Sequence, residues 1–170
     1  MKLRPLLVRS SFLAMFSFAS AEPLKVGDAA PVVSAVTDSG TTLNLGDVYK
    51  KNAYTLVWFY PAALTRGCTA QGCSLRDAGA ELSKRGVAIV GVSVDPIEKQ
   101  KEFKDTNHFS YPLLSDTDRK VMKAFGQTGT GAASREAYLV NQEGKVVYHD
   151  LKQTDKQAEM VIAFLDGKKS

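Results

Sequence analysis

Cysteine and histidine are scarce in this chain of 170 residues, which holds two of each: Cys68 and Cys73, and His108 and His149. A domain of this size does not need a disulfide to fold. A bridge between Cys68 and Cys73 would close a very short loop, so its chain-entropy contribution to stability would be small. The two cysteines therefore form a structural disulfide of small effect, bind a metal ion, or act as a reactive pair. The residues around them must distinguish these three roles.

The sequence also lacks a long apolar run, an excess of one charge, internal repeats and low-complexity tracts. Its N-terminal apolar run, residues 12–18, is much shorter than the ~20 residues of a membrane-spanning helix, so no membrane anchor is expected. The formal net charge of +4 falls to about +1 once Lys2, Arg4 and Arg9 are removed with the acid-free residues 1–21. A nearly neutral domain lacks the basic surface that nucleic acid binding requires.

Residues 1–21 have the pattern of a cleaved signal peptide: a basic start, a short apolar middle and a small-residue end, Ala19-Ser20-Ala21. An organelle transit peptide shares the arginines, the serines and the lack of acids, and it is the alternative. We therefore expect an exported, periplasmic protein. Residues 22–170 suit one domain with a sizeable core.

Strand and helix patterns alternate through this domain. We expect a hairpin within 28–47, strands at 54–60, 87–94, 111–115, 136–140 and 145–149, and helices at 68–85, 97–107, 116–125 and 153–166. Strand 111–115 is expected at a sheet edge. This order predicts an α/β fold with helices packed over a mostly parallel sheet. Functional residues of such folds lie at the carboxyl ends of strands, and strand 54–60 ends where the cysteine segment begins.

Cys68 is expected in the first turn of the helix that follows Pro61. Free backbone amides and the positive end of the helix dipole favour a thiolate there, and the thiolate is the nucleophilic form of cysteine. Arg66 could add positive potential. Thr65 could donate a hydrogen bond to the sulfur, cap the helix, or do both. Pro61 could shield the sulfur from water or simply end the strand.

The spacing of the two cysteines argues against a passive staple. In an intact α-helix, positions i and i+5 have Cα atoms about 8–9 Å apart, whereas a disulfide tolerates at most about 7 Å. If both cysteines are helical when reduced, a bridge requires the first turns to unwind. Gly67 and Gly72 offer backbone freedom for that change. The spacing therefore favours a pair that cycles between dithiol and disulfide.

The segment also resembles a known family. Residues 61–68, P-A-A-L-T-R-G-C, match the Pro-x-x-x-Thr-x-x-Cys motif of peroxiredoxins, although Arg66 stands where the family usually has proline. A second cysteine five residues later resembles the bacterioferritin-comigratory, or Q-type, branch, whose resolving cysteine lies in the same helix. Similar stretches continue along the chain, at V-G-V-S-V-D (90–95), L-S-D-T-D (114–118) and R-E-A-Y-L-V (135–140).

This resemblance implies a thiol-dependent peroxidase on a thioredoxin-like fold, with a central mixed sheet flanked by helices and an N-terminal β-hairpin. Cys68 would attack hydrogen peroxide or an organic hydroperoxide and become a sulfenic acid. Thr65 and Arg135 would bind the peroxide oxygens, beside Pro61. Cys73 would then form the intramolecular disulfide, which a thioredoxin-like dithiol reduces. No metal or organic cofactor is implied, and an intramolecular partner allows a monomer.

Two other functions fit parts of the sequence. An exported thiol–disulfide oxidoreductase would share the fold, but its cysteines are expected as Cys-x-x-Cys, whereas four residues separate this pair. A copper-binding assembly protein would need the cysteines together with a histidine. His108 is expected at a helix end and His149 at the end of a strand, where surface roles are ordinary.

Overall fold

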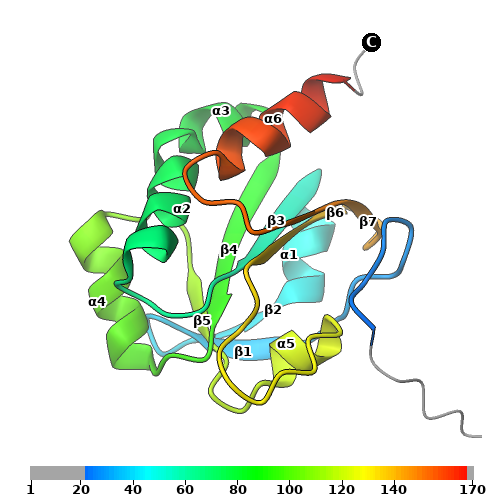
Figure 1. Cartoon of the computed structure of the whole chain (residues 1–170). Coiled ribbons are helices and arrows are strands. Elements are labelled where there is room, and N and C mark those ends of the chain that lie inside the picture. Colours follow the sequence, from blue (N-terminus) through cyan, green and yellow to red (C-terminus); the bar gives the residue numbers. More distant parts are fainter. Residues whose placement is uncertain (1–21, 168–170) are drawn as a thin grey trace, which may run out of the picture.

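The computed structural model describes residues 22–167. The expected signal peptide, residues 1–21, lies outside the described residues. A seven-stranded sheet runs through the centre in the order β2-β1-β5-β4-β3-β6-β7, with helices on both faces (Figure 1). Its strands are β1 Ser34–Thr37, β2 Thr42–Asn44, β3 Tyr54–Phe59, β4 Val87–Ser93, β5 Leu113–Ser115, β6 Glu136–Asn141 and β7 Val146–Leu151.

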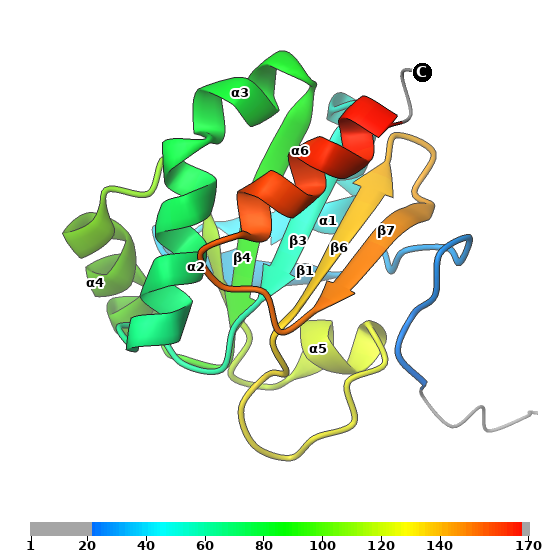
Figure 2. The same ribbon diagram turned by 45° about the horizontal axis from the view of Figure 1, so that its top comes forward.

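The helices are α1 Leu45–Lys51, α2 Arg66–Asp77, α3 Gly79–Lys84, α4 Ile97–Asn107, α5 Lys120–Ala124 and α6 Gln157–Gly167. Helices α2, α3 and α6 lie over one face of the sheet, and α1 lies behind it (Figure 2). Residues of α5 pack in the core of the same face as α1. Over residues 22–167, none of these helices has the length and apolar character needed to span a bilayer.

Alternation along the buried strands creates one core on each face. In β3, Leu56 and Trp58 join the cluster under α2, α3, α4 and α6, whereas Val57 and Phe59 join the cluster under α1 and α5. Successive side chains of a strand point to opposite faces, so an unbroken apolar run is the pattern of a strand covered on both sides. The prediction of a doubly buried strand at 54–60 is therefore confirmed.

Several predictions about the sheet need correction. The sheet is mixed, which confirms what the family resemblance implied and corrects the mostly parallel sheet expected from the order of strands and helices, because only the β3–β4 and β4–β5 pairs are parallel. The N-terminal hairpin, β1 with β2, is confirmed. Its strand β1 also pairs antiparallel with β5. Strand β5 is therefore an interior strand and not the expected edge.

Some helix bounds also differ from prediction. The expected helix 68–85 begins two residues earlier and breaks at Ala78 into α2 and α3, and Leu75 and Leu82 pack in the same cluster across the break. Helix α5 begins only at Lys120 because the two carboxylate oxygens of Asp116 accept the amides of Val121 and Met122, each at 2.8 Å.

Candidate active site

Cys68 lies in the first turn of α2, where the chain leaves the carboxyl end of β3 through the loop 60–65. Its side chain is fully buried, and both cysteines are free thiols. The first turn contains no acidic residue. The first amides of a helix have no intrahelical acceptor, so they direct positive partial charge toward this end of α2. The predicted helix-start position of Cys68 is confirmed.

Arg135 reaches Cys68 although 67 positions separate them. Its Nη2 donates to the Cys68 Sγ at 3.3 Å. The pairing of β3 with β6 explains the approach: Phe59 at the end of β3 lies opposite Glu136, so Arg135 enters the sheet beside the start of the cysteine loop. Both residues are among those predicted from the sequence, and the fold brings them together.

A chain of buried amides holds Arg135 in place. Its Nη1 donates to the Gln71 Oε1 at 2.6 Å, and the Gln71 Nε2 donates to the Gln157 Oε1 at 2.9 Å. The Gln157 Nε2 donates in turn to the Asp150 Oδ2 at 2.7 Å. Gln71 and Gln157 are fully buried. The guanidinium therefore cannot leave the sulfur without breaking a charge-assisted bond, which is the stronger kind of hydrogen bond.

Neither glutamine is among the residues predicted from the sequence. Gln71 stands three residues after Cys68, so the two share one face of α2, and this spacing was a usable signal. Gln157 carried no such signal, because it meets the site only through the docking of α6 against α2.

Asp95, after β4, anchors the cysteine loop. Its Oδ2 accepts the Ala63 amide at 2.7 Å and the Ser93 hydroxyl at 2.8 Å, and its Oδ1 lies 2.7 Å from the Lys99 Nζ. Burial opposes ionisation of this carboxyl, but Lys99 and these donors overcome it and lower its pKa. The loop also contains Leu64 at φ +65°, a left-handed conformation that is costly for a residue with a Cβ. The surrounding bonds therefore fix the loop's shape before any substrate arrives.

Thr65 is the N-cap residue of α2, but its side chain does not cap the helix. Its hydroxyl donates to the Ala62 carbonyl at 2.9 Å. Thr65 therefore stands at the N-cap position, but its hydroxyl makes neither of the two expected bonds, the cap to the helix amides or the bond to the sulfur. Pro61 is half-buried at the start of the loop, and Arg66 is exposed at the first helical position.

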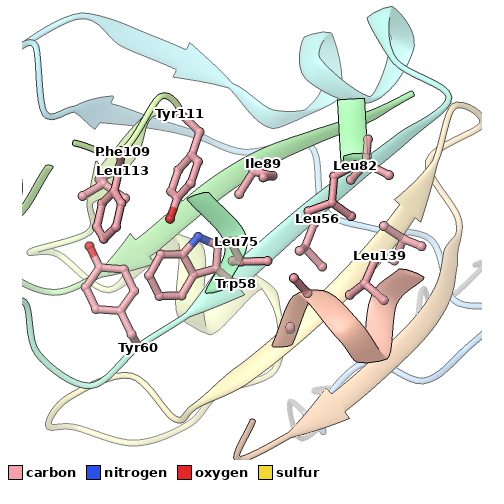
Figure 3. Close-up of a cluster of buried hydrophobic side chains, with 14 of the residues drawn as sticks. Leu56, Trp58, Tyr60, Leu75, Leu82, Ile89, Phe109, Tyr111, Leu113 and Leu139 are labelled. Atoms are coloured by element: carbon pink, nitrogen blue, oxygen red, sulfur yellow. The ribbon is translucent and has the colours of Figure 1, made fainter. Parts of the chain in front are cut away.

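Near the loop 60–65, one end of the core consists of aromatic rings. Tyr60 stacks on Trp58 with ring centroids 4.5 Å apart, and its hydroxyl donates to the buried Gln100. Figure 3 shows Phe109 and Tyr111 at the same end, while Leu56, Leu82 and Leu139 fill the other. Burial raises the pKa of the Tyr60 hydroxyl, so it remains a neutral donor at physiological pH.

Cys73 is half-buried further along α2 and faces α4. Its Sγ lies 3.8 Å from the Asn107 Oδ1. Both cysteines belong to the same continuous helix, so the geometric argument that a disulfide requires unwinding applies to this state.

Gly72 has a packing role in addition to the predicted backbone freedom. A Cβ built there would lie 2.4 Å from the Phe109 Cζ, so the ring occupies the space that a side chain would need.

Neither histidine joins the cysteines in a metal-binding cluster. His149 stacks on the Tyr138 ring at 4.2 Å and contacts the Glu136 carboxylate at 3.2 Å. His108 is exposed and ends α4 in a left-handed conformation. Within residues 22–167, no group of three or more His, Cys, Asp or Glu side chains is arranged to hold a metal ion. Nothing in the described part of the chain favours the copper-binding alternative.

Comparison with known proteins identifies the family of this chain. The AhpC/TSA family matches residues 26–149, which is more than half of the chain. The chain is 37% identical over 153 residues to peroxiredoxin Bcp of Escherichia coli, an alignment that covers 84% of this chain and 96% of that protein.

Solved structures agree as well. Peroxidoxin BcpB from Mycobacterium tuberculosis superposes with a TM-score of 0.80 at 30% identity, over 86% of this chain and 99% of that one. The bacterioferritin comigratory protein of Xanthomonas campestris superposes with a TM-score of 0.75 at 25% identity, over 86% and 98%. The chain therefore belongs to the AhpC/TSA family, as a peroxiredoxin of the bacterioferritin-comigratory (Q-type) branch and hence a thiol-dependent peroxidase.

Proposed function

We propose that Cys68 is the residue that reduces the peroxide and that Cys73 resolves the product. The observation that carries this assignment is the Arg135 Nη2, 3.3 Å from a buried sulfur at the start of α2, with a second thiol on the same helix. A positive donor fixed beside the sulfur can stabilise both the thiolate and the charge that develops on a peroxide oxygen. Arg135 and Thr65 are the proposed peroxide-binding residues, and Pro61 begins their loop.

The cycle has three balanced steps. The Cys68 thiolate attacks one peroxide oxygen, the O–O bond breaks, and water or an alcohol leaves after taking a proton. Cys68 is then a sulfenic acid, whose sulfur Cys73 attacks to form the disulfide and release water. A dithiol reductant restores both thiols and is itself oxidised to a disulfide. None of these steps requires a metal or an organic cofactor.

The burial of Cys68 supports a small substrate. A fully buried sulfur suits a hydroperoxide better than the exposed disulfide of a protein, so burial disfavours the thiol–disulfide oxidoreductase alternative. We include organic hydroperoxides among the substrates, because alkyl peroxide reduction is the activity attributed to the structurally similar bacterioferritin comigratory protein of Xanthomonas campestris.

The setting of the enzyme is part of the proposal. The pattern of residues 1–21 supports export to the periplasm, with cleavage after Ala21. The reductant would then be a thioredoxin-like dithiol protein of that compartment. Because both cysteines of the cycle lie in one helix, a monomer is sufficient for the chemistry.

Stopped-flow peroxide reduction tests the two assignments. Cys68→Ser should consume no peroxide above background, because the nucleophile is lost. Cys73→Ser should complete one fast turnover and then stop, because no disulfide can be presented to the reductant. Peroxide consumption by Cys68→Ser at the wild-type rate would disprove the first assignment. Unimpaired multiple turnover by Cys73→Ser with a dithiol reductant would disprove the second.

A further inference from the structure

We propose that Asp150, on β7, is a positioning residue for the first step of the cycle: it holds the Arg135 guanidinium against the Cys68 sulfur through two intervening glutamine amides. In that step the S–O bond forms as the O–O bond of the peroxide breaks, and the departing oxygen takes a proton and leaves as water or an alcohol. This inference rests on the roles proposed above for Cys68 and Arg135.

The two ends of the amide chain fix the direction of every hydrogen bond in it. A guanidinium has only donors and a carboxylate has only acceptors, whereas an amide side chain has both. Arg135 must therefore meet the oxygen of Gln71, at 2.6 Å, and Asp150 must meet the nitrogen of Gln157, at 2.7 Å. The nitrogen of Gln71 then faces the oxygen of Gln157, at 2.9 Å. Only this arrangement satisfies all three bonds.

Burial makes the chain costly to break. Gln71 and Gln157 are fully buried, so an amide group that loses its partner has no bulk water to replace it. The Asp150 Oδ2 also accepts the Tyr148 hydroxyl at 2.7 Å, and its Oδ1 is buried without a hydrogen-bond partner among residues 22–167. Burial raises the pKa of this carboxyl, and the bonds from Tyr148 and Gln157 oppose that rise because they favour the charged form.

The distance of the carboxylate from Arg135 matters as much as its presence. Within residues 22–167, no carboxylate lies within ion-pair distance of the Arg135 guanidinium. Its Nη1 donates to Gln71 and, at 3.4 Å, to the Gly67 carbonyl, while its Nη2 faces the sulfur. Neutral amides fix the guanidinium without neutralising it, so its charge remains available to the sulfur. Asp150 polarises those amides from two side chains away and does not compete with the sulfur.

An exchange of two side chains tests this arrangement. Asp150→Asn removes the charge and allows position 150 to present either an oxygen or a nitrogen to Gln157. Gln157→Glu places a second carboxylate against Asp150, so two acceptors meet and repel each other. The double variant Asp150→Asn/Gln157→Glu moves the carboxylate one place along the chain. That carboxylate can accept the Gln71 nitrogen on one side and the new amide on the other, so every bond is satisfied again.

The measurement is the rate constant of sulfenic acid formation when the reduced full chain is mixed with hydrogen peroxide in a stopped-flow instrument at neutral pH. We expect Asp150→Asn to slow this step about threefold, because a charge-assisted bond, roughly twice as strong as a neutral one, becomes neutral. Gln157→Glu should slow it about tenfold, because the chain is interrupted next to Gln71. The double variant should be faster than both and within about twofold of the wild type.

Controls separate this role from a general effect on folding. Tyr148→Phe removes the other hydrogen bond of Asp150, and Glu159→Gln removes an exposed carboxylate of α6. Both should react at the wild-type rate. Gln71→Leu cuts the chain between Asp150 and the sulfur, so Asp150→Asn should cause no further slowing in that background, whereas an effect through general stability would add to it.

Three results would overturn the inference: a wild-type rate in Asp150→Asn, a further slowing by Asp150→Asn in the Gln71→Leu background, or a double exchange variant that is not faster than both single variants. In each case the wild type would still form a sulfenic acid at Cys68. Failure of the proposed function would differ, because the wild type itself would then lack that species.

Discussion

Replacement of Gly72 by alanine tests what holds α2 in its helical form. The Cβ of an alanine would lie 2.4 Å from the Phe109 Cζ and 3.0 and 3.1 Å from the two Cε atoms. The ring cannot move aside freely, because it is stacked on Tyr111 at 5.2 Å and abuts Phe103 edge-on at 5.0 Å. The Tyr111 hydroxyl also donates to the Gly72 carbonyl at 2.8 Å.

Two opposing effects set the magnitude. Overpacking of a closed site costs about 1–3 kcal/mol, whereas alanine is about 1 kcal/mol more favourable than glycine inside a helix. The net expectation for reduced Gly72→Ala is a loss of about 1 kcal/mol, or a Tm lower by about 2–4 °C for a domain of this size. Because unwinding gives up the same contacts, disulfide formation should be faster, by up to about fivefold.

Thermal unfolding of the reduced protein and rapid-quench measurement of the disulfide provide the two readouts. Phe109→Leu supplies a matched background, in which the clash is relieved and alanine should be neutral or stabilising. If Gly72→Ala were more stable than the wild type and slower to form the disulfide, Gly72 would be present only for its backbone freedom and the packing argument would be wrong.

Two other contacts lead to predictions of their own. Gln71→Leu removes the Oε1 that accepts the Arg135 Nη1 at 2.6 Å. Loss of this charge-assisted bond should slow sulfenic acid formation about tenfold. A wild-type stopped-flow rate in a variant that still unfolds cooperatively would contradict this expectation. Burial opposes ionisation of Glu136, but hydrogen bonds from His149 and Tyr138 lower its pKa below 4.5. Its contribution to stability is therefore present above pH 4.5 and lost as the pH falls through the lower folded-state value. The Tm advantage of wild type over Glu136→Gln should shrink in acid, and an advantage independent of pH would refute the assignment.

Much of the site was accessible from local sequence. The run Tyr54–Phe59 predicted a strand buried on both faces, and the motif that follows it placed Cys68 in the first turn of a helix. These features depend on neighbouring residues, because strand alternation, helix starts and cysteine spacing are local properties. Arg135 came from the family resemblance and not from its local sequence.

Features that depend on distant pairing were predicted poorly. The apolar pattern of Leu113–Ser115 indicates that the strand is buried, but it does not indicate which strands pair with it. The strand expected at the sheet edge is therefore an interior strand, paired with β1 on one side and β4 on the other. The start of α5 depends on a side chain, Asp116, that competes for the backbone amides. Nothing near Gln157 in the sequence indicates that it would meet Gln71.

The sequence by itself determined which sulfur lies at a helix start, the position from which the nucleophile is proposed, and that a Cys68–Cys73 bridge requires a change of helix. Both conclusions follow from positions within one element. Only the tertiary structure decided what surrounds each sulfur. Pairing of β3 with β6 brings Arg135 to Cys68, and packing of α2 on α4 places Cys73 beside Asn107. The physical reason is that electrostatic and packing interactions depend on distances in space. The order of residues does not specify those distances for residues far apart in the chain.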